Sequence, residues 1–261
     1  MKFNVQLESI ATNNINMDFF YVPWDSHTFN RNVAQISKFK IHNTEKALND
    51  FQLFVAWCSE NKITFTSCQL LHSQINEALF LENRDFKFIE LNYHPIIHNI
   101  ELLELPISNI DVSAAEKSDI TLLANIAEKI FHNERFHTDP LIETSLANKR
   151  YRFWLENAFE QEHQKILKCT LNNEIIAFFV VEYPESNSCL WSLAGMLPEF
   201  QGKGLGKQAW KAMLKYHKNE AINTVSTSIS SHNTPVFNLY VALGFRFPEP
   251  YATFHCSFNY T

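Results

Sequence analysis

Glycine is scarce in this chain, and its placement constrains the fold more than any other feature of the sequence. The 261 residues include only five glycines, all in the last third of the chain, and three of them fall within five residues. Average usage is about 7% of positions, several times higher. Because glycine adopts positive φ readily and lets a ligand approach the backbone, the cluster marks a segment with special backbone geometry.

The glycine cluster lies between a predicted strand and a predicted amphipathic helix. Gly202, Gly204 and Gly206 allow consecutive backbone N–H groups to turn toward one ligand. The helix N-terminus adds the positive end of its dipole, so the loop suits a pyrophosphate, and Lys203 and Lys207 add positive charge. The spacing is neither that of a Walker loop nor that of the Rossmann motif. A tight strand-to-helix turn without a ligand is the alternative.

The hydrophobic pattern predicts a mixed α/β order with two domains. Strand and helix patterns alternate up to about residue 105 and restart from Ile107. We therefore predict a smaller N-terminal α/β domain over residues 1–105 and a second α/β domain, with a mixed sheet, over residues 106–261. The predicted elements are strands 19–21, 33–41, 63–71, 86–93, 107–112, 166–171, 175–183, 189–196, 222–230 and 245–260, and helices 43–60, 73–84, 120–131 (capped by Ser118-Asp119), 141–159, 204–220 and 234–243.

Two segments echo each other across these domains. Residues 79–88 and 238–247 both read as a short helix running into a strand. In this alignment Leu81 replaces Tyr240, and no glycine loop precedes it. The first domain would then be structural or substrate-shaping, with no cofactor of its own. The alternative is that any helix-to-strand junction has this pattern.

Composition and charge argue against several classes of protein. A net charge of −6 gives no electrostatic reason to expect nucleic-acid binding. No apolar run approaches the ~20 residues of a membrane span, and the first residues lack a signal-peptide pattern, so we expect a cytoplasmic protein. The five cysteines lie far apart without a Cys-x-x-Cys pair and read as reduced thiols. His94 and His98 are separated by Pro95, which opposes a helical metal site, and no metal is predicted.

Two short blocks resemble the signature of the GNAT superfamily of N-acetyltransferases. Their order matches that family, and the resemblance covers about residues 107–260. It implies the acyl-CoA N-acyltransferase fold, acetyl-CoA as cosubstrate and a small-molecule amine as acceptor. The blocks are Gln201-x-x-Gly204-x-Gly206 after Pro198, and Asn233, Leu239-Tyr240 and Leu243-Gly244-Phe245 further along the chain.

The resemblance also implies a role for each matching residue. Loop amides would hold the CoA pyrophosphate, and the N–H of Met196 would polarise the thioester carbonyl. Tyr240 would protonate the departing thiolate, since a phenol with a pKa of ~10 is neutral at pH 7; an ordinary core tyrosine is the alternative. For the base, Glu182, His137, Asp139 and solvent remain open. The predicted cofactor-binding residues are Met196, Leu197, Gln201, Gly202, Lys203, Gly204, Leu205, Gly206, Lys207 and Asn233.

The predicted acceptor rests on a second resemblance, to two-domain sugar-nucleotide acetyltransferases of the TDP-fucosamine acetyltransferase type. It lies in residues 22–29 and 135–140 and implies substrate binding by Trp24, Phe136 and His137. Three arginines could meet a diphosphate; they are Arg135, Arg150 and Arg152. Trp24 and Phe136 could equally be core residues. Another small amine, a protein N-terminus, or a CoA-binding regulator without turnover are the alternatives, and a homodimer is compatible with the resemblance.

Overall fold

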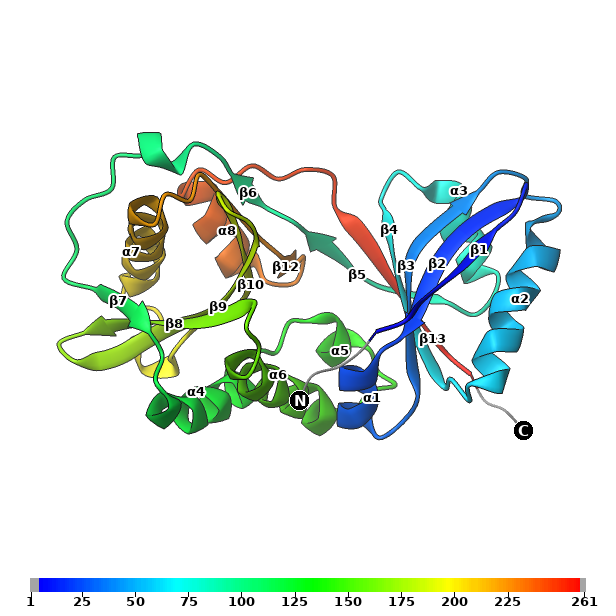
Figure 1. The fold of residues 1–261 in the computed structure, drawn as a ribbon, viewed down its shortest axis with the longest axis horizontal. Helices are drawn as coiled ribbons and strands as arrows, with labels where there is room; N and C mark the ends of the chain where they lie inside the picture. The colour runs from blue at the N-terminus through cyan, green and yellow to red at the C-terminus, as the bar shows by residue number, and fades with distance from the viewer. Residues whose placement is uncertain (1–4, 259–261) are drawn as a thin grey trace. The chain divides into compact units, whose positions relative to one another are not determined.

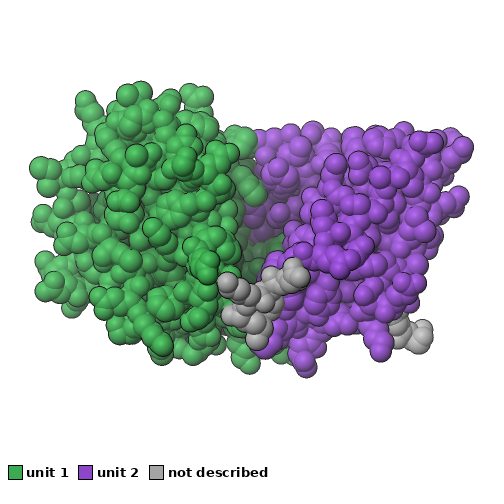
Figure 2. Space-filling view, in the orientation of Figure 1, with its two compact units in different colours: residues 1, 93–137, 143–248 green, residues 2–92, 138–142, 249–261 purple. Residues whose placement is uncertain are grey.

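The protein is described by a computed structural model that covers residues 5–258. Within that range the chain divides into two compact units (Figure 2). Unit 1 consists of residues 93–137 and 143–248. Unit 2 consists of the described parts of 2–92 and 249–261 together with residues 138–142. Both units combine helices with a sheet of mixed strand direction, which confirms the predicted α/β class.

Unit 1 is built on a six-stranded sheet in the order β6-β11-β10-β9-β8-β7. Its strands are β6 (Ile96–Ile97), β7 (Asp111–Ala114), β8 (Gln164–Leu171), β9 (Glu174–Glu185), β10 (Ser188–Met196) and β11 (Thr224–Thr227), and the short β12 (Ile229–Ser230) follows β11. Its helices are α4 (Lys117–Ile130), α5 (Arg135–Thr138), α6 (Thr144–Phe159), α7 (Leu205–Asn219) and α8 (Thr234–Ala242), with single 3₁₀ turns η1 (Ile100–Leu102) and η2 (Pro198–Phe200).

Helices cover both faces of the unit 1 sheet, with α4 and α6 opposite α7 (Figure 1). Along β9, Phe178 and Val180 pack in the core shared with α4 and α6. Phe179 and Val181 alternate with them and pack in the core shared with α7 and α8. Successive side chains of a strand point to opposite faces, so a strand buried on both faces carries a continuous apolar run. β9 is therefore a fully buried support for β10 beside it.

Unit 2 has its own sheet, whose strands run in the order β1-β2-β3-β4-β13-β5. Its core is rich in phenylalanine, and the ring of Phe51 contacts those of Phe39, Phe54, Phe80 and Phe86. The elements are β1 (Leu7–Ala11), β2 (Ile15–Tyr21), β3 (Val33–Ile41), β4 (Phe65–Leu71), β5 (Lys87–Tyr93) and β13 (Tyr251–Ser257), with helices α1 (Pro23–Phe29), α2 (Ala47–Glu60) and α3 (Ile75–Glu82).

The compact units differ from the predicted domains 1–105 and 106–261 in where they divide. β6 lies before the predicted boundary, yet it pairs with β11 in the unit 1 sheet. β13 lies at the other end of the chain, yet it pairs with β4 and β5 and completes the unit 2 sheet. The sequence predicts one bent strand or a hairpin over 245–260, whose last two residues lie outside the described range, whereas the only named strand found there is residues 251–257. Inserted between two strands, β13 hydrogen-bonds on both of its edges.

Helix α4 begins earlier than its sequence suggests. The cap predicted at Ser118-Asp119 is wrong, because Glu116 is the N-cap and Asp119 occupies the third helical position. Their side chains bond reciprocally to the backbone, and the Asp119 carboxylate accepts from the N–H of Glu116 at 2.8 Å. A reciprocal pair of this kind satisfies two helix N–H groups that lack intrahelical acceptors.

Segment 138–142 belongs to unit 2, where a buried ion pair holds it. Asp139 Oδ2 lies 2.7 Å from His255 Nδ1 on β13, and both residues are 3% exposed. Burial alone would raise the pKa of the Asp139 carboxyl, but hydrogen bonds from His255 and the Leu141 N–H, with Arg31 nearby, lower that pKa below its usual value. The ionised carboxylate is thus stabilised by folding.

We expect Asp139→Ala to lower the free energy of unfolding by ~3–5 kcal/mol, because it leaves a buried His255 without its counter-charge. A carboxyl whose pKa is lower in the folded state stabilises the fold above its unfolded pKa, and this stability is lost as pH falls through the folded value. Denaturant unfolding between pH 7 and pH 2 should show a larger loss in the wild type than in the variant, because other carboxyls with lowered pKa values, such as those of Glu77 and Asp119, remain in both. Asp50→Ala, at an exposed carboxylate bonded to Thr12 and Asn14, is the control and should cost less; equal losses would contradict the prediction.

Candidate active site

β10 and β11 begin as a parallel pair and then diverge. Four residue pairs join them, from Ser188 opposite Thr224 to Trp191 opposite Thr227. An irregularity between Trp191 and Leu193 follows in the β9–β10 ladder. Among the described residues, β10 continues to Met196 with no further partner on β11. Beyond the point of divergence, one edge of β10 is therefore available to an extended ligand.

The hydrogen-bond pattern of β10 identifies which amides face that open edge. The N–H of Leu197 donates to the carbonyl of Ile176 on β9 at 2.9 Å. In an antiparallel pair alternate residues bond to the same neighbour, so Gly195 also faces β9, while Ala194 and Met196 face the open edge. Met196 was predicted from the sequence. The sequence analysis did not name Ala194 as an open-edge residue, because the sequence does not reveal the strand register after the irregularity. Once Met196 is placed at the open edge, the alternation of a strand places Ala194 there as well.

The loop after β10 has the geometry that its glycines predict. Gly202 and Gly204 have φ values of +71° and +74°, and a Cβ added at either would meet no atom within 4 Å. Gly204 is the N-cap of α7 and no side chain caps the helix, so the first-turn amides lack an intrahelical or side-chain acceptor. Lys203 Nζ lies 5.8 Å from the centroid of the Phe200 ring. The loop presents backbone donors and open space to a ligand.

Close packing brings the start of α7 next to α8 and the end of β10. A Cβ added to Gly206 would lie 4.0 Å from Leu239 Cδ2 and from Met196 Sδ. Leu205 and Lys207 share this first turn of α7 with Gly206. The Gln201 side chain, from the loop, donates to the carbonyl of Met196 at 2.8 Å. Most of the predicted cofactor-binding residues thus lie together around one end of β10.

Two predicted site residues lie on or before α8. Asn233 caps this helix by accepting from the N–H of Val236 at 3.3 Å. Tyr240 is 1% exposed, and its hydroxyl oxygen accepts a hydrogen bond from Trp210 Nε1 at 3.2 Å. Burial raises the pKa of Tyr240, which hydrogen bonds with Trp210 and Thr227 partly offset. The phenol is therefore neutral and already hydrogen-bonded in this structure.

These features agree with the comparison with known protein families. Residues 127–245 match the model of the acetyltransferase (GNAT) family. The matched range is less than half of the chain, and it is called the GNAT domain after this match. The matched range contains β10, the glycine loop, α7 and α8, and it ends at Phe245. No curated protein matches the chain.

Solved structures share the fold at low sequence identity. A functionally unknown conserved protein from Staphylococcus epidermidis has a TM-score of 0.68 at 12% identity, over 97% of this chain and 95% of that one. A GCN5-related N-acetyltransferase from Sphaerobacter thermophilus has 0.64 at 10% identity, over 94% and 81%. A tandem GNAT protein from the clavulanic acid biosynthesis pathway has 0.62 at 11%, over 95% and 80%. At these identities the likeness concerns the fold.

Unit 2 repeats the strand arrangement of the GNAT domain. β3 and β4 pair in parallel over four residues, and β3 then continues to Ile41. As in the GNAT domain, one helix connects the parallel strands and a second helix follows them. The second helices are α3 and α8, which occupy the two segments that echo each other in sequence. No glycine lies in the loop between β3 and α2.

Side chains close the diverging strands of unit 2. Gln74 donates from Nε2 to the Phe39 carbonyl at 2.9 Å and accepts from the Leu71 N–H at 3.0 Å, so one amide joins both strands. Glu77, which is 2% exposed, accepts from the Ile41 N–H at 3.1 Å and pairs with Lys40 at 3.0 Å. The backbone groups that an extended ligand would use are therefore already bonded.

The predicted substrate residues Phe136 and His137 lie on α5, outside the sheet of the GNAT domain. Phe136 is 1% exposed, and the guanidinium carbons of Arg135 and Arg150 lie 4.5 Å and 4.8 Å from its ring centroid. His137 Nε2 lies 2.8 Å from Asn148 Oδ1, and its ring stacks on Tyr151. Burial lowers the pKa of His137, and the positive charge of Arg150 contributes. Phe136 is a core ring in this structure, and His137 is neutral.

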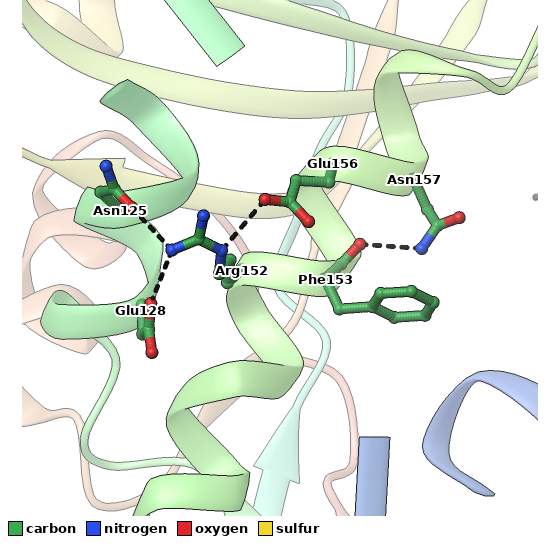
Figure 3. Close-up of polar contacts among 6 residues, drawn as sticks. All are labelled: Asn125, Glu128, Arg152, Phe153, Glu156 and Asn157. Carbon is green, nitrogen blue, oxygen red and sulfur yellow. Dashed lines mark hydrogen bonds and ion pairs between the residues drawn. The ribbon is translucent and has the colours of Figure 1, made fainter. Parts of the chain in front are cut away.

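Arg152 and Trp24 have different surroundings. Arg152 donates to Glu128 and Asn125 on α4 and to Glu156 on its own helix, α6 (Figure 3). Two carboxylates thus share its charge. Trp24 lies on α1 of unit 2, where its ring is 6.4 Å from that of Phe20. The sequence-based prediction assigned Trp24, Phe136 and His137 to one substrate site. In the structure Trp24 lies on α1, whereas Phe136 and His137 lie on α5.

Glu182 lies far along the strand from Met196, at the end of β10. It pairs in the ladder with Leu190, six residues before Met196, which corresponds to roughly 20 Å along the strand. Gln164 donates to its carboxylate at 2.8 Å. Within residues 5–258, no His, Cys, Asp and Glu side chains group as a metal site requires. No helix in this range combines the length and apolar character of a bilayer span.

Proposed function

We propose that the protein is an acetyl-CoA-dependent N-acetyltransferase. One observation carries this proposal: the open edge of β10 leads directly into a positive-φ glycine loop at the N-terminus of α7, inside the range that matches the GNAT family. Amides of Gln201 to Lys207 would bind the pyrophosphate of CoA. The pantetheine arm would pair with β10 as an added strand, near Asn233.

In the proposed transfer, the backbone amides at the open edge of β10 and the hydroxyl of Tyr240 have separate roles. The N–H groups of Ala194 and Met196 would stabilise the negative charge that develops on the thioester oxygen. As the amine nitrogen bonds to the carbonyl carbon, the carbon–sulfur bond breaks and its electron pair leaves with sulfur. Tyr240 donates its proton to that sulfur, and the amine gives one proton to a base. The products are the amide and free CoA.

His137 is the base that the surroundings of the three candidates favour. Asp139 is paired with His255, and Glu182 lies about 20 Å along β10 from Met196. The contact of His137 Nε2 with the Asn148 carbonyl oxygen requires an N–H there, which leaves Nδ1 as a lone pair. Within the described chain no hydrogen bond reaches that Nδ1. His137→Gln should therefore remove the acidic limb of the pH profile of kcat, and an unchanged limb would reassign the base to solvent.

For the acceptor we propose a nucleotide-linked amino sugar of the dTDP type. The support is the pair of guanidinium groups over Phe136, a chemistry that suits a diphosphate. A release assay for the CoA thiol would compare this acceptor with the free amino sugar, a polyamine and a peptide N-terminus. Faster turnover of the polyamine or peptide would replace the sugar by that acceptor. Binding of acetyl-CoA without turnover of any amine would leave a CoA-binding regulator.

We expect one molecule of acetyl-CoA to bind per chain, because Gln74 and Glu77 occupy the corresponding edge in unit 2. Isothermal titration calorimetry of the full chain measures this stoichiometry directly. Gln74→Ala should leave the affinity unchanged within about twofold. Two molecules per chain, or a large loss of affinity in Gln74→Ala, would show that the first half of the chain binds the cofactor after all.

A further inference from the structure

A buried chain of hydrogen bonds runs through Tyr240. Trp210 Nε1 donates to the Tyr240 hydroxyl oxygen at 3.2 Å. Thr227 also lowers the pKa of Tyr240, and Thr227 Oγ1 donates to the backbone carbonyl of Trp191 at 2.9 Å. The side chains of Trp210, Tyr240 and Thr227 are 4%, 1% and 3% exposed. All three side chains are therefore largely shielded from solvent.

The groups at the two ends of this set of contacts determine which side chains donate a hydrogen and which accept one. An indole nitrogen can only donate, and a backbone carbonyl can only accept. Thr227 uses its proton on the carbonyl of Trp191. The Tyr240 oxygen accepts the N–H of Trp210. The Tyr240 oxygen therefore already carries one external donor, and its own proton is left for another acceptor.

The position of Thr227 relates this chain to the open edge. Thr227 is the last residue of β11 that pairs with β10, opposite Trp191, so it marks the point at which the strands diverge. Trp210 lies on α7, four residues after Gly206 and one helical turn from the glycine loop. The three side chains thus lie on α7, which follows the glycine loop, on α8, and at the end of β11, where the open edge of β10 begins.

We propose that Trp210 is a positioning residue for proton donation by Tyr240, and that the thioester sulfur accepts that proton. This inference rests on the proposed acetyl transfer. When the carbon–sulfur bond breaks, the O–H bond of Tyr240 breaks and an S–H bond forms. The phenolate left behind keeps the N–H of Trp210 and can receive the hydroxyl proton of Thr227 as a second donor. Water restores the proton of Tyr240 after the products leave.

A double-mutant cycle separates this role from a role in packing. Trp210→Phe removes the N–H donor, and the cycle combines it with Tyr240→Phe. Trp191→Phe is the matched control, because Trp191 Nε1 is another buried indole donor of this core but donates to His217 at 2.9 Å. If Trp210→Phe does not fold, replacement of Trp210 by benzothienylalanine removes the N–H and keeps the shape of the side chain. The measurement is kcat for CoA release, with the amine that the wild type uses fastest.

We expect Trp210→Phe to lower kcat about 10- to 100-fold, the range for a lost hydrogen bond to a charged group. In the Tyr240→Phe background the same change should alter kcat by less than about threefold. The Trp191 ring contacts that of Tyr240 but donates no hydrogen bond to it, so the effect of Trp191→Phe should differ less between the two backgrounds than that of Trp210→Phe. Equal effects of Trp210→Phe in both backgrounds would overturn the positioning role alone. A wild type that releases no CoA with any amine would overturn the proposed function, and this inference with it.

Discussion

Tyr240→Phe should lower kcat for acetyl transfer by ~10²–10⁴-fold, the range for loss of a general acid, and leave the affinity for acetyl-CoA nearly unchanged. The substitution keeps the ring and its contacts with Trp191 and Phe245. It also removes the acceptor of the buried Trp210 N–H, so the free energy of unfolding should fall by ~1–3 kcal/mol. Steady-state kinetics and denaturant unfolding on the same preparations measure the two effects.

The control for this prediction is Tyr183→Phe, a second tyrosine of the GNAT domain at the far end of β9. It should change kcat by less than about twofold. A fall of only about twofold in Tyr240→Phe, with chemistry established as the slow step, would assign the proton to water. A fall in kcat that simply follows the unfolded fraction would make Tyr240 a core residue without a catalytic role.

Gly204→Val should weaken acetyl-CoA binding by about 10- to 100-fold or more, which corresponds to the loss of at least one hydrogen bond to a charged phosphate. The space around Gly204 is open, with no atom within 4 Å of an added Cβ, so the new side chain would extend into the volume left for the pyrophosphate. Its φ of +74° also strains any branched residue there. Isothermal titration calorimetry measures the affinity.

Backbone strain alone is tested with Gly244→Ala. Gly244 has a φ of +88° at the end of α8, outside the glycine loop. Both variants should lose stability, whereas only Gly204→Val should lose affinity. If Gly204→Val folds and binds acetyl-CoA as tightly as the wild type, the loop is a turn without a ligand.

The sequence was informative where a local pattern decides local structure. The strand predicted over 33–41 has these bounds in the structure, and α7 lies within one residue of its predicted ends. The strands predicted over 166–171 and 175–183 form a hairpin, and Asn172 and Asn173 between them adopt the positive φ that a tight hairpin turn favours. In each case the decisive contacts lie within a few residues of one another.

Long-range pairing could not be predicted in the same way. β13 pairs with strands that lie far away in the sequence, and its residues carry no mark of those partners. Likewise, nothing about Tyr240 in sequence predicts the indole of Trp210 as a donor, because that contact depends on how α7 and α8 pack. The backbone role of Ala194 depends on a register that an irregularity in β10 resets.

The placement of β13 has a consequence for how the protein is made. β4 and β5 leave the ribosome long before residues 251–257, which must pass between them to complete the sheet of unit 2. Until then both strands expose unpaired edges, which favour aggregation and recruit chaperones. Nascent chains stalled before residue 251 should therefore be protease-sensitive in their first half. Folding of the N-terminal strands depends on residues that are synthesised near the end of translation.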